Sequence, residues 1–297
     1  MDRIDSVCVF GAGTLGWQIA LQCASQYPVY LYDLSSEALV RALSNITNEL
    51  DKWVQVGEIS TEVKESTLQR LVIEADPVKA VEGVGLVIEA VPEKLELKRR
   101  VFGELDAVCG VDTIISTNSS SIRVSLIEDV TGRRDRVLNT HFYSAPWRSR
   151  IVELMKGSMT SDETITCVEG FMKSIGMLPF VVRRESTGFI FNRVWRSVKR
   201  ECLHLVDEGV ASFEDVDRAW MSYFETEIGP FGLMDKVGLD VVRDIENVYY
   251  GESKDLRDLP PKLIIEKIER GELGVKTGRG FYSYPDPEYL DPHWLEP

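Results

Sequence analysis

The stretch Val7–Ala20, VCVFGAGTLGWQIA, decides which fold we expect for this chain. A short apolar strand leads directly into three glycines, Gly11, Gly13 and Gly16, which open a helical pattern. The first glycine permits a tight turn, the second lets a phosphate approach the backbone, and the third lets the helix pack closely on the strand. A diphosphate would then lie at the helix N-terminus, where free N–H groups favour an anion. The stretch therefore predicts a dinucleotide site.

The next strand supports this prediction and indicates which dinucleotide binds. PVYLYD ends in Asp33, 17 residues after Gly16, where an acid is expected to bind the adenosine ribose hydroxyls. A carboxylate repels a 2′-phosphate, and no arginine follows in LSSEA (residues 34–38). NAD is therefore favoured over NADP. An incidental aspartate after an ordinary glycine turn would explain the spacing poorly.

Further along the chain, two regions differ in pattern. Before residue 185, short apolar runs alternate with amphipathic helical patterns at 37–54, 95–109 and 163–174, which predicts a Rossmann-type α/β domain with a doubly wound, mostly parallel sheet. Beyond it, helical spacing dominates, including one continuous pattern over 233–250. We expect a nucleotide-binding domain at 1–185 and an all-α domain at 186–297 that ends in an extended, proline-rich tail. The strand predictions are VCVF, PVYLYD, GLVIEAV, DTIIST, RVLNTHF, RIVELM and LPFVV.

Composition excludes some functions. The 297 residues include 34 Lys plus Arg against 48 Asp plus Glu, a net charge of −14. Such an acidic surface argues against binding to nucleic acid or to an anionic membrane, because both need positive potential. The five cysteines show no CxxC pair, which predicts neither a metal site nor a disulfide framework. We expect no metal, no membrane span and a cytoplasmic location.

Hydride exchange at an alcohol needs an acid/base group at the substrate oxygen, and histidine suits this role. The strand RVLNTHF would deliver His141 to the carboxyl edge of the sheet, where such folds bind ligands. Glu153, in the next strand, could hold its other ring nitrogen. On spacing alone, a packed histidine and a surface glutamate explain the pattern equally well.

Taken together, the motifs resemble those of the 3-hydroxyacyl-CoA dehydrogenase family over nearly the full length. The resemblance implies that His141 is the acid/base, that Glu153 orients it, and that Ser120 and Asn192 contact the substrate. For Glu93, Lys98 and Lys276, a purely structural or solvated role competes with cofactor binding. The motifs are GAGTLG, VIEAVPEKLELK, STNSSS, HF with Glu153 twelve residues after the histidine, STGFIFNR, IGPFGLMDKVGLD and KTGRGFY. The implied NAD-binding residues are Gly11, Gly13, Thr14, Leu15, Gly16, Asp33, Ala90, Val91, Glu93, Lys98, Asn118, Ser120, Ser144 and Lys276.

The sequence departs from the family pattern near the substrate. HFYSAP replaces the common HFFNP, so Ser144 stands where an asparagine approaches the nicotinamide. Glu49 and Val56 occupy positions where family members hold CoA with a serine and a lysine. Arg148 suggests a substrate anion instead, since arginine pairs with planar oxyanions; a solvated loop explains it at least as well.

Three interpretations follow. The first is an NAD-dependent dehydrogenase that interconverts a 3-hydroxyacyl and a 3-oxoacyl compound. The second is a relative that acts on a free 3-hydroxy acid or a ketone of a specialised biosynthetic pathway. The third, from another class, is a non-catalytic NAD(H)-binding protein of the lens-crystallin kind. The resemblance also implies a homodimer formed through the helical domain.

Overall fold

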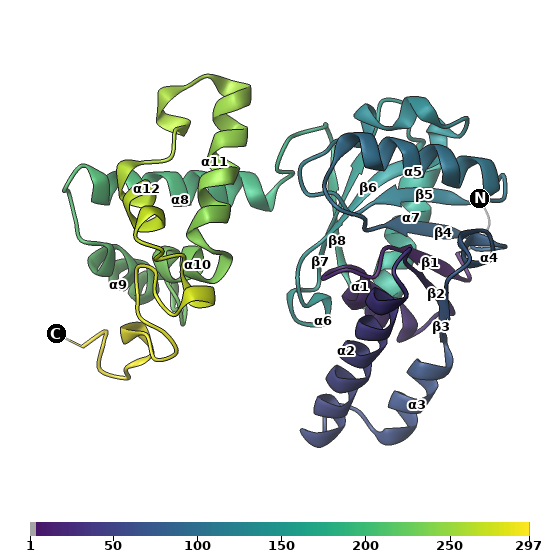
Figure 1. The fold of residues 1–297 in the computed structure, drawn as a ribbon, viewed down its shortest axis with the longest axis horizontal. Helices are drawn as coiled ribbons and strands as arrows, with labels where there is room; N and C mark the ends of the chain where they lie inside the picture. The colour runs from purple at the N-terminus through teal and green to yellow at the C-terminus, as the bar shows by residue number, and fades with distance from the viewer. Residues whose placement is uncertain (1–3, 297) are drawn as a thin grey trace. The chain divides into compact units, whose positions relative to one another are not determined.

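The computed structural model describes residues 4–296 and divides the chain into two compact units (Figure 1). The first unit ends at Ile190 and the second begins at Phe191, five residues beyond the predicted boundary. These five residues belong with the first unit because they bond back to it. The Ile190 amide donates to Glu153 at 2.8 Å, and the Ser186 amide donates to the sulfur of Met155.

The first unit is built on one eight-stranded sheet in the order β3-β2-β1-β4-β5-β6-β7-β8. Neighbouring strands are parallel except β6 and β7, which are antiparallel. The chain order reverses beside β1, at the switch point where such sheets bind ligands. The predicted Rossmann-type, mostly parallel sheet is confirmed. The strands are β1 (Val7–Phe10), β2 (Val29–Tyr32), β3 (Leu71–Glu74), β4 (Leu86–Glu89), β5 (Ile114–Thr117), β6 (Val137–Phe142), β7 (Ile151–Lys156) and β8 (Leu178–Val182).

One strand, β3, is missing from the sequence prediction. Its four residues, LVIE, lie at the edge of the sheet and are at most partly buried. An edge strand lacks the second neighbour and the fully buried face that make a central strand conspicuous in a sequence. Only its pairing with β2 identifies it.

Helices cover both faces of the sheet, and the side chains along a strand point alternately to one helix layer and to the other. In β1, Val7 and Val9 pack on one side, while Cys8 and Phe10 pack on the other. The first layer contains α1, α2 and α7, and the second contains α4 and α5. The helices of this unit are α1 (Gly16–Ala24), α2 (Ser36–Gln55), α3 (Thr61–Gln69), α4 (Pro77–Val81), α5 (Leu95–Val108), α6 (Pro146–Ser149) and α7 (Asp162–Ser174).

Helix α2 shows how local sequence sets an element. The Ser35 hydroxyl accepts the Ala38 amide at 3.2 Å and so caps the N-terminus. Leu39, Ala42, Ile46 and Leu50 recur at helical spacing and are all buried. Burying a large aliphatic side chain of this kind stabilises the fold by roughly 1.5–3 kcal/mol. The far end of α2 lies beside α3 (Figure 1).

The described part of the second unit is helical, as predicted, with one division that the sequence pattern misses. The pattern over 233–250 suggested one helix, but Gly238 adopts φ +100° and separates α10 from α11. A residue with a side chain would be strained in that conformation. The helices are α8 (Phe191–Asp207), α9 (Phe213–Phe224), α10 (Pro230–Val237), α11 (Leu239–Ser253) and α12 (Lys262–Glu269).

Short 3₁₀ turns occur in both units: η1 (Val124–Leu126), η2 (Glu128–Val130), η3 (Arg134–Arg136), η4 (Leu256–Asp258), η5 (Val275–Thr277) and η6 (Glu288–Leu290).

The C-terminal tail differs from the extended segment that its prolines suggested. It folds through the turn η6, and Tyr289 and Trp294 are buried in the core of the second unit. The two aromatic rings lie 4.9 and 6.3 Å from the ring of Tyr282. Burial of large aromatic surface holds the tail against the helices.

Two further predictions concern membrane-spanning helices and the cysteines. None of the helices in residues 4–296 is long and apolar enough to cross a membrane. All five cysteines are free, and four of them are buried.

Candidate functional site

The glycine turn after β1 is open at Gly13 and tightly packed at Gly16. A Cβ at Gly13 would meet nothing within 4 Å, whereas one at Gly16 would overlap the carbonyl oxygen of Gly11. Gly11 itself adopts φ +117°. Thr14 is exposed, Leu15 is half-buried, and the first turn of α1 carries no acidic residue. The turn can therefore receive an anion at its outer face, as a dinucleotide requires.

Asp33 closes this turn from the end of β2. One carboxylate oxygen accepts the Ala12 amide at 2.8 Å, and the other accepts the Ser35 amide at 2.9 Å. The side chain is only half-buried, which leaves lone pairs for a ligand's hydroxyls. This anchoring explains why the acid is needed at the strand end.

Beside the turn lies a cavity of about 760 Å³. It is open to the glycine turn and to Asp33, and the backbone after β4 forms part of its wall through Ala90 and Val91. Apolar side chains contribute most of the remaining wall, which suits the flat rings of a nucleotide. The lining residues are Phe10, Gly11, Gly13, Thr14, Tyr32, Asp33, Leu34, Ala90, Val91, Pro92, Leu97, Arg100, Val101 and Glu104.

Lys98 does not present its ammonium to this cavity. Its side chain is 1% exposed, and Nζ lies 2.8 and 3.1 Å from the two oxygens of Glu89, 3.2 Å from the Val91 carbonyl and 3.3 Å from Glu93. The suggested solvated helix face is therefore wrong, and in this conformation Lys98 reaches a cofactor only through its partners. Burial raises the pKa of the Glu89 carboxyl, although the positive charge of Lys98 acts to lower it.

Glu93 binds the serine loop that follows β5. It accepts hydrogen bonds from the hydroxyls of Ser119 and Ser121 and from the Ser121 amide. Burial opposes its charge, but Lys98 and the serine hydroxyls hold the pKa of Glu93 below its usual range. Ser120 lies exposed between the two bound serines. The carboxylate thus anchors the loop on either side of Ser120.

His141 and Glu153 face each other across the antiparallel pair β6–β7. Histidine Nδ1 lies 3.0 Å from Oε2 of Glu153, and the side chains are 5% and 1% exposed. Two further groups bond the carboxylate: the Tyr143 hydroxyl donates to Oε2 at 2.8 Å, and the Ile190 amide donates to Oε1 at 2.8 Å. A carboxylate on Nδ1 leaves Nε2 as the nitrogen that can exchange a proton with a ligand.

The segment before α8 takes an unusual backbone path to reach this pair. Gly188 and Phe189 have φ +76° and +54°. This turn stacks the Phe189 ring 5.0 Å from His141 and directs the next amide, that of Ile190, at Glu153. Left-handed backbone at a residue with a side chain is costly, and it persists where the surroundings demand it.

Neighbouring loops are tied to the pair. Asn118 accepts the Phe142 amide at 2.8 Å, which links the end of β5 to the end of β6. Gln18 of α1 accepts the Ala145 amide at 2.7 Å and the Ser144 hydroxyl at 3.5 Å. Ser144, where the family pattern has asparagine, therefore adjoins the glycine-turn helix.

The two arginines of this loop differ. The Arg150 guanidinium donates to the Gly176 carbonyl at 2.9 Å, so it is used within the fold. Arg148 is exposed on α6 and, among the described residues, makes no ion pair or side-chain hydrogen bond. Both side chains are exposed, but Arg148 is the one of the two whose guanidinium makes no bond within the described residues.

The remaining candidates belong to the second unit. Asn192 is half-buried in the first turn of α8. Lys276 pairs with Asp240 at 2.5 and 2.6 Å, and that pairing lowers the pKa of Asp240. Both residues belong to the second unit, whereas His141 and the glycine turn belong to the first.

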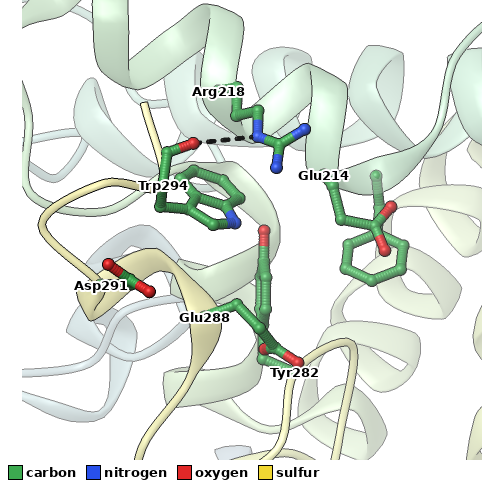
Figure 2. A pocket seen from close by; sticks show the side chains of 7 residues that line it. Glu214, Arg218, Tyr282, Glu288, Asp291 and Trp294 are labelled. Atoms are coloured by element: carbon green, nitrogen blue, oxygen red, sulfur yellow. Dashed lines mark hydrogen bonds between the residues drawn. The ribbon is translucent and has the colours of Figure 1, made fainter. Parts of the chain in front are cut away.

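The second unit has a smaller hollow of its own, about 330 Å³ (Figure 2). Arg218 donates to the Trp294 carbonyl at 3.1 Å and lies over its ring, while Glu214, Glu288 and Asp291 also line the hollow. Its lining holds neither a histidine nor a glycine turn. It offers nothing for hydride chemistry.

Residues that the sequence analysis missed are Glu89, Gln18 and Tyr143. Tyr143 stands two residues after His141, and side chains two apart on an extended chain share a face. That spacing was available as a signal. The contacts of Glu89 and Gln18 are made with distant segments, so no local pattern announces them.

Comparisons with known proteins agree over most of the chain. Residues 6–186 match the model of the 3-hydroxyacyl-CoA dehydrogenase NAD-binding domain, and residues 188–284 match that of the C-terminal domain. A 3-hydroxybutyryl-CoA dehydrogenase of Clostridioides difficile is 34% identical over 94% of this chain and 99% of its own. A 3-hydroxyadipyl-CoA dehydrogenase of Escherichia coli is 36% identical over 96% of this chain, which spans 60% of that longer protein. The crystal structure of (S)-3-hydroxybutyryl-CoA dehydrogenase from Ralstonia eutropha superposes with a TM-score of 0.89 at 32% identity, covering 95% of this chain and all of the other.

Proposed function

The chain belongs to the 3-hydroxyacyl-CoA dehydrogenase family, and from this premise we propose that it interconverts a 3-hydroxyacyl and a 3-oxoacyl compound with His141 and Glu153 as its acid/base pair. The observation that carries the proposal is the 3.0 Å contact between Nδ1 and a buried carboxylate. It leaves Nε2 as the proton-exchanging atom at the carboxyl edge of the sheet.

NAD, when bound at the glycine turn and Asp33, supplies the acceptor or donor of the hydride. In oxidation, Nε2 of His141 takes the hydroxyl proton, and Glu153 stabilises the imidazolium that forms. Ser120, on the loop anchored by Glu93, donates a hydrogen bond to the substrate oxygen. Asn192 steadies the substrate from the helical unit. In reduction, the imidazolium returns the proton to the carbonyl oxygen.

Replacing His141 tests this mechanism. We expect His141→Ala to lose roughly 10²–10⁴-fold in turnover, the usual worth of acid/base assistance, while NADH still binds as judged by its fluorescence. His204→Ala is the matched control, because within residues 4–296 the His204 ring forms its hydrogen bond with the Arg257 carbonyl of the second unit. Near-normal turnover of His141→Ala would remove the pair from the mechanism.

A second candidate concerns the substrate, which we propose carries an anionic group bound by Arg148. This guanidinium is exposed on the loop that follows His141. Glu49 is paired with Lys52 and Val56 is exposed, so neither reproduces the CoA-binding side chains of the family. The E. coli relative is named for an adipyl thioester, whose acyl chain ends in a carboxylate. The substrate is then a carboxylate-bearing thioester or a free 3-oxo acid.

Kinetics separate these substrates. NADH consumption with acetoacetyl-CoA and with acetoacetate shows whether the thioester is required. For a substrate with a free carboxylate, we expect Arg148→Ala to raise KM by about 10- to 100-fold, the effect of a charge-assisted hydrogen bond. A neutral substrate should be unaffected. Equal effects on both kinds of substrate, or none, would end this proposal. Inactivity toward every 3-oxo compound tested, with NADH binding intact, would favour a non-catalytic NAD(H)-binding protein.

We also propose a homodimer formed through the second unit. Helix α11 exposes Val241, Ile245 and Val248, which share one face at helical spacing. Burying such a stripe against a second copy would remove apolar surface from water. Light scattering should show a dimer for the wild type and a monomer for Ile245→Glu; identical masses for both would contradict this interface.

A further inference from the structure

We propose that Tyr143 tunes the acid/base pair: its hydroxyl shares one carboxylate oxygen of Glu153 with His141 and so makes the imidazolium a stronger acid. The inference rests on the proposed function for its catalytic consequence. Its physical content concerns how tightly His141 holds a proton, which is measurable without a substrate.

The geometry is that of one acceptor atom with two donors. The Tyr143 hydroxyl lies 2.8 Å and Nδ1 of His141 lies 3.0 Å from the same atom, Oε2 of Glu153. The two rings lie 4.5 Å apart, and the carboxylate is 1% exposed. Because solvent does not reach the carboxylate, the protein donors determine how much of its charge acts on the histidine.

A hydrogen bond from a neutral hydroxyl withdraws charge from a carboxylate oxygen without adding a positive charge of its own. The oxygen therefore stabilises the imidazolium less than it would without the hydrogen bond from Tyr143. A less stabilised imidazolium releases its proton more readily. The arrangement makes His141 a better proton donor and a weaker base, which suits the step in which it gives its proton to a 3-oxo substrate.

Several groups of the first unit face the pair. The Glu153 carboxylate comes from β7, and the Tyr143 hydroxyl comes from the residue directly after β6. The segment before α8 contributes the apolar ring of Phe189 and the uncharged amide of Ile190, which binds the other carboxylate oxygen. Replacing Tyr143 by phenylalanine removes a neutral hydrogen-bond donor to Oε2 of Glu153 and leaves every formal charge in place.

The test uses the full chain labelled with ¹³C at its histidine rings. With three histidines in the sequence, each ring can be followed by NMR as pH is varied, and His141→Gln identifies the resonance of His141. In Tyr143→Phe we expect the titration midpoint of His141 to rise by about 0.5–1 pH unit, the size expected for loss of one neutral hydrogen bond. The rings of His204 and His293 should titrate unchanged.

Tyr27→Phe is the matched control. It removes the hydroxyl of another partly buried tyrosine, which bonds Ser174 rather than the pair, and it should leave the His141 midpoint in place. A second variant acts in the opposite direction: 3-fluorotyrosine installed at position 143 is a stronger donor and should lower the midpoint. An unchanged or lowered midpoint in Tyr143→Phe overturns the proposal, and so does a raised midpoint with fluorotyrosine.

Enzyme kinetics keep this inference distinct from the proposed function. If the function is right, the pH at which 3-oxoacyl reduction falls to half its maximum rises in Tyr143→Phe by the same amount as the NMR midpoint. A shifted NMR midpoint in a protein that reduces no 3-oxo compound would refute the function alone. A working reductase whose NMR midpoint stays in place would refute the role of Tyr143 alone.

Discussion

At the scale of single residues, pairing register decides which side chains meet. His141 and Glu153 are twelve residues apart, yet they are direct partners in the antiparallel ladder of β6 and β7. Cross-strand partners have their Cβ atoms about 4.5–5.5 Å apart and point to the same face. A shift of register by one residue would turn one of the two side chains to the opposite face. The candidate acid/base pair therefore depends on the short loop that joins these strands.

Lys98 gives a prediction at this scale. Lys98→Met should destabilise the first unit by about 3–5 kcal/mol, because it leaves the buried Glu89 carboxylate without its cation. Urea unfolding measures the change. The double variant Lys98→Met with Glu89→Gln should recover part of the loss.

An exposed ion pair supplies the comparison for Lys98. Arg41, 67% exposed and 3.8 Å from Glu37, should change stability by less than about 0.5 kcal/mol when replaced by alanine. A loss for Lys98→Met no larger than that for Arg41→Ala would show that the buried pair contributes little.

At the scale of elements, the three glycines between β1 and α1 serve both the packing of the fold and the binding of a ligand. Gly16 lies against the carbonyl of Gly11, while Gly13 faces open space. The two positions look alike in the GxGxxG pattern, but only the packing shows that one is needed by the fold and the other is free.

This difference predicts opposite outcomes for two alanine substitutions. Gly13→Ala should unfold at the wild-type temperature yet bind NADH at least about tenfold more weakly, because the methyl group occupies the path of the phosphates. Gly16→Ala should lower the unfolding temperature of the first unit, since its Cβ would overlap the backbone of Gly11. Calorimetry and NADH fluorescence titration measure both. Normal NADH affinity in Gly13→Ala would place the diphosphate elsewhere.

At the scale of the whole molecule, each unit has its own core, and two buried aspartates organise the second. Asp217 accepts the amides of Phe231 and Gly232 at the start of α10, and Asp235 accepts those of Phe281 and Tyr282. The motifs IGPFGLMDKVGLD and KTGRGFY are thus partners in one structure: an aspartate of the first binds the backbone of the second.

Asp217 predicts a pH dependence of stability for this unit. Burial raises the pKa of Asp217 to about 6, with Asp235 adding to the effect. A carboxyl whose pKa is higher in the folded than in the unfolded chain, near 4, contributes stability that is present at low pH. That stability is lost as pH rises from about 4 to about 6, because the unfolded chain ionises first.

We therefore expect the unfolding temperature of the wild type to fall relative to that of Asp217→Asn between pH 4 and pH 6.5. The limit is about 3 kcal/mol, the free energy that corresponds to the difference in pKa. Comparison with the variant cancels the titration of the other carboxyls. A constant difference across this range would mean that Asp217 ionises normally in the folded protein.

Much of the fold and of the nucleotide site could be predicted from local sequence. The strand–glycine–helix stretch at 7–20, the acid at Asp33 and the change from alternating to all-helical pattern follow from periodicity and backbone chemistry, which act over a few residues. Resemblance to a family added the proposed roles of His141, Ser120 and Asn192. An edge strand such as β3 and the break at Gly238 escaped because their neighbours in space define them.

What the sequence by itself determined is the fold class, the cofactor and the residue types available for catalysis. Only the tertiary structure decided how those residues are used: that Lys98 is buried against Glu89, that Arg150 bonds the Gly176 carbonyl, and that Tyr143 shares an oxygen with His141. The physical reason is that burial and hydrogen bonding depend on segments distant in the chain. A side chain's chemistry is local, but its partners are not.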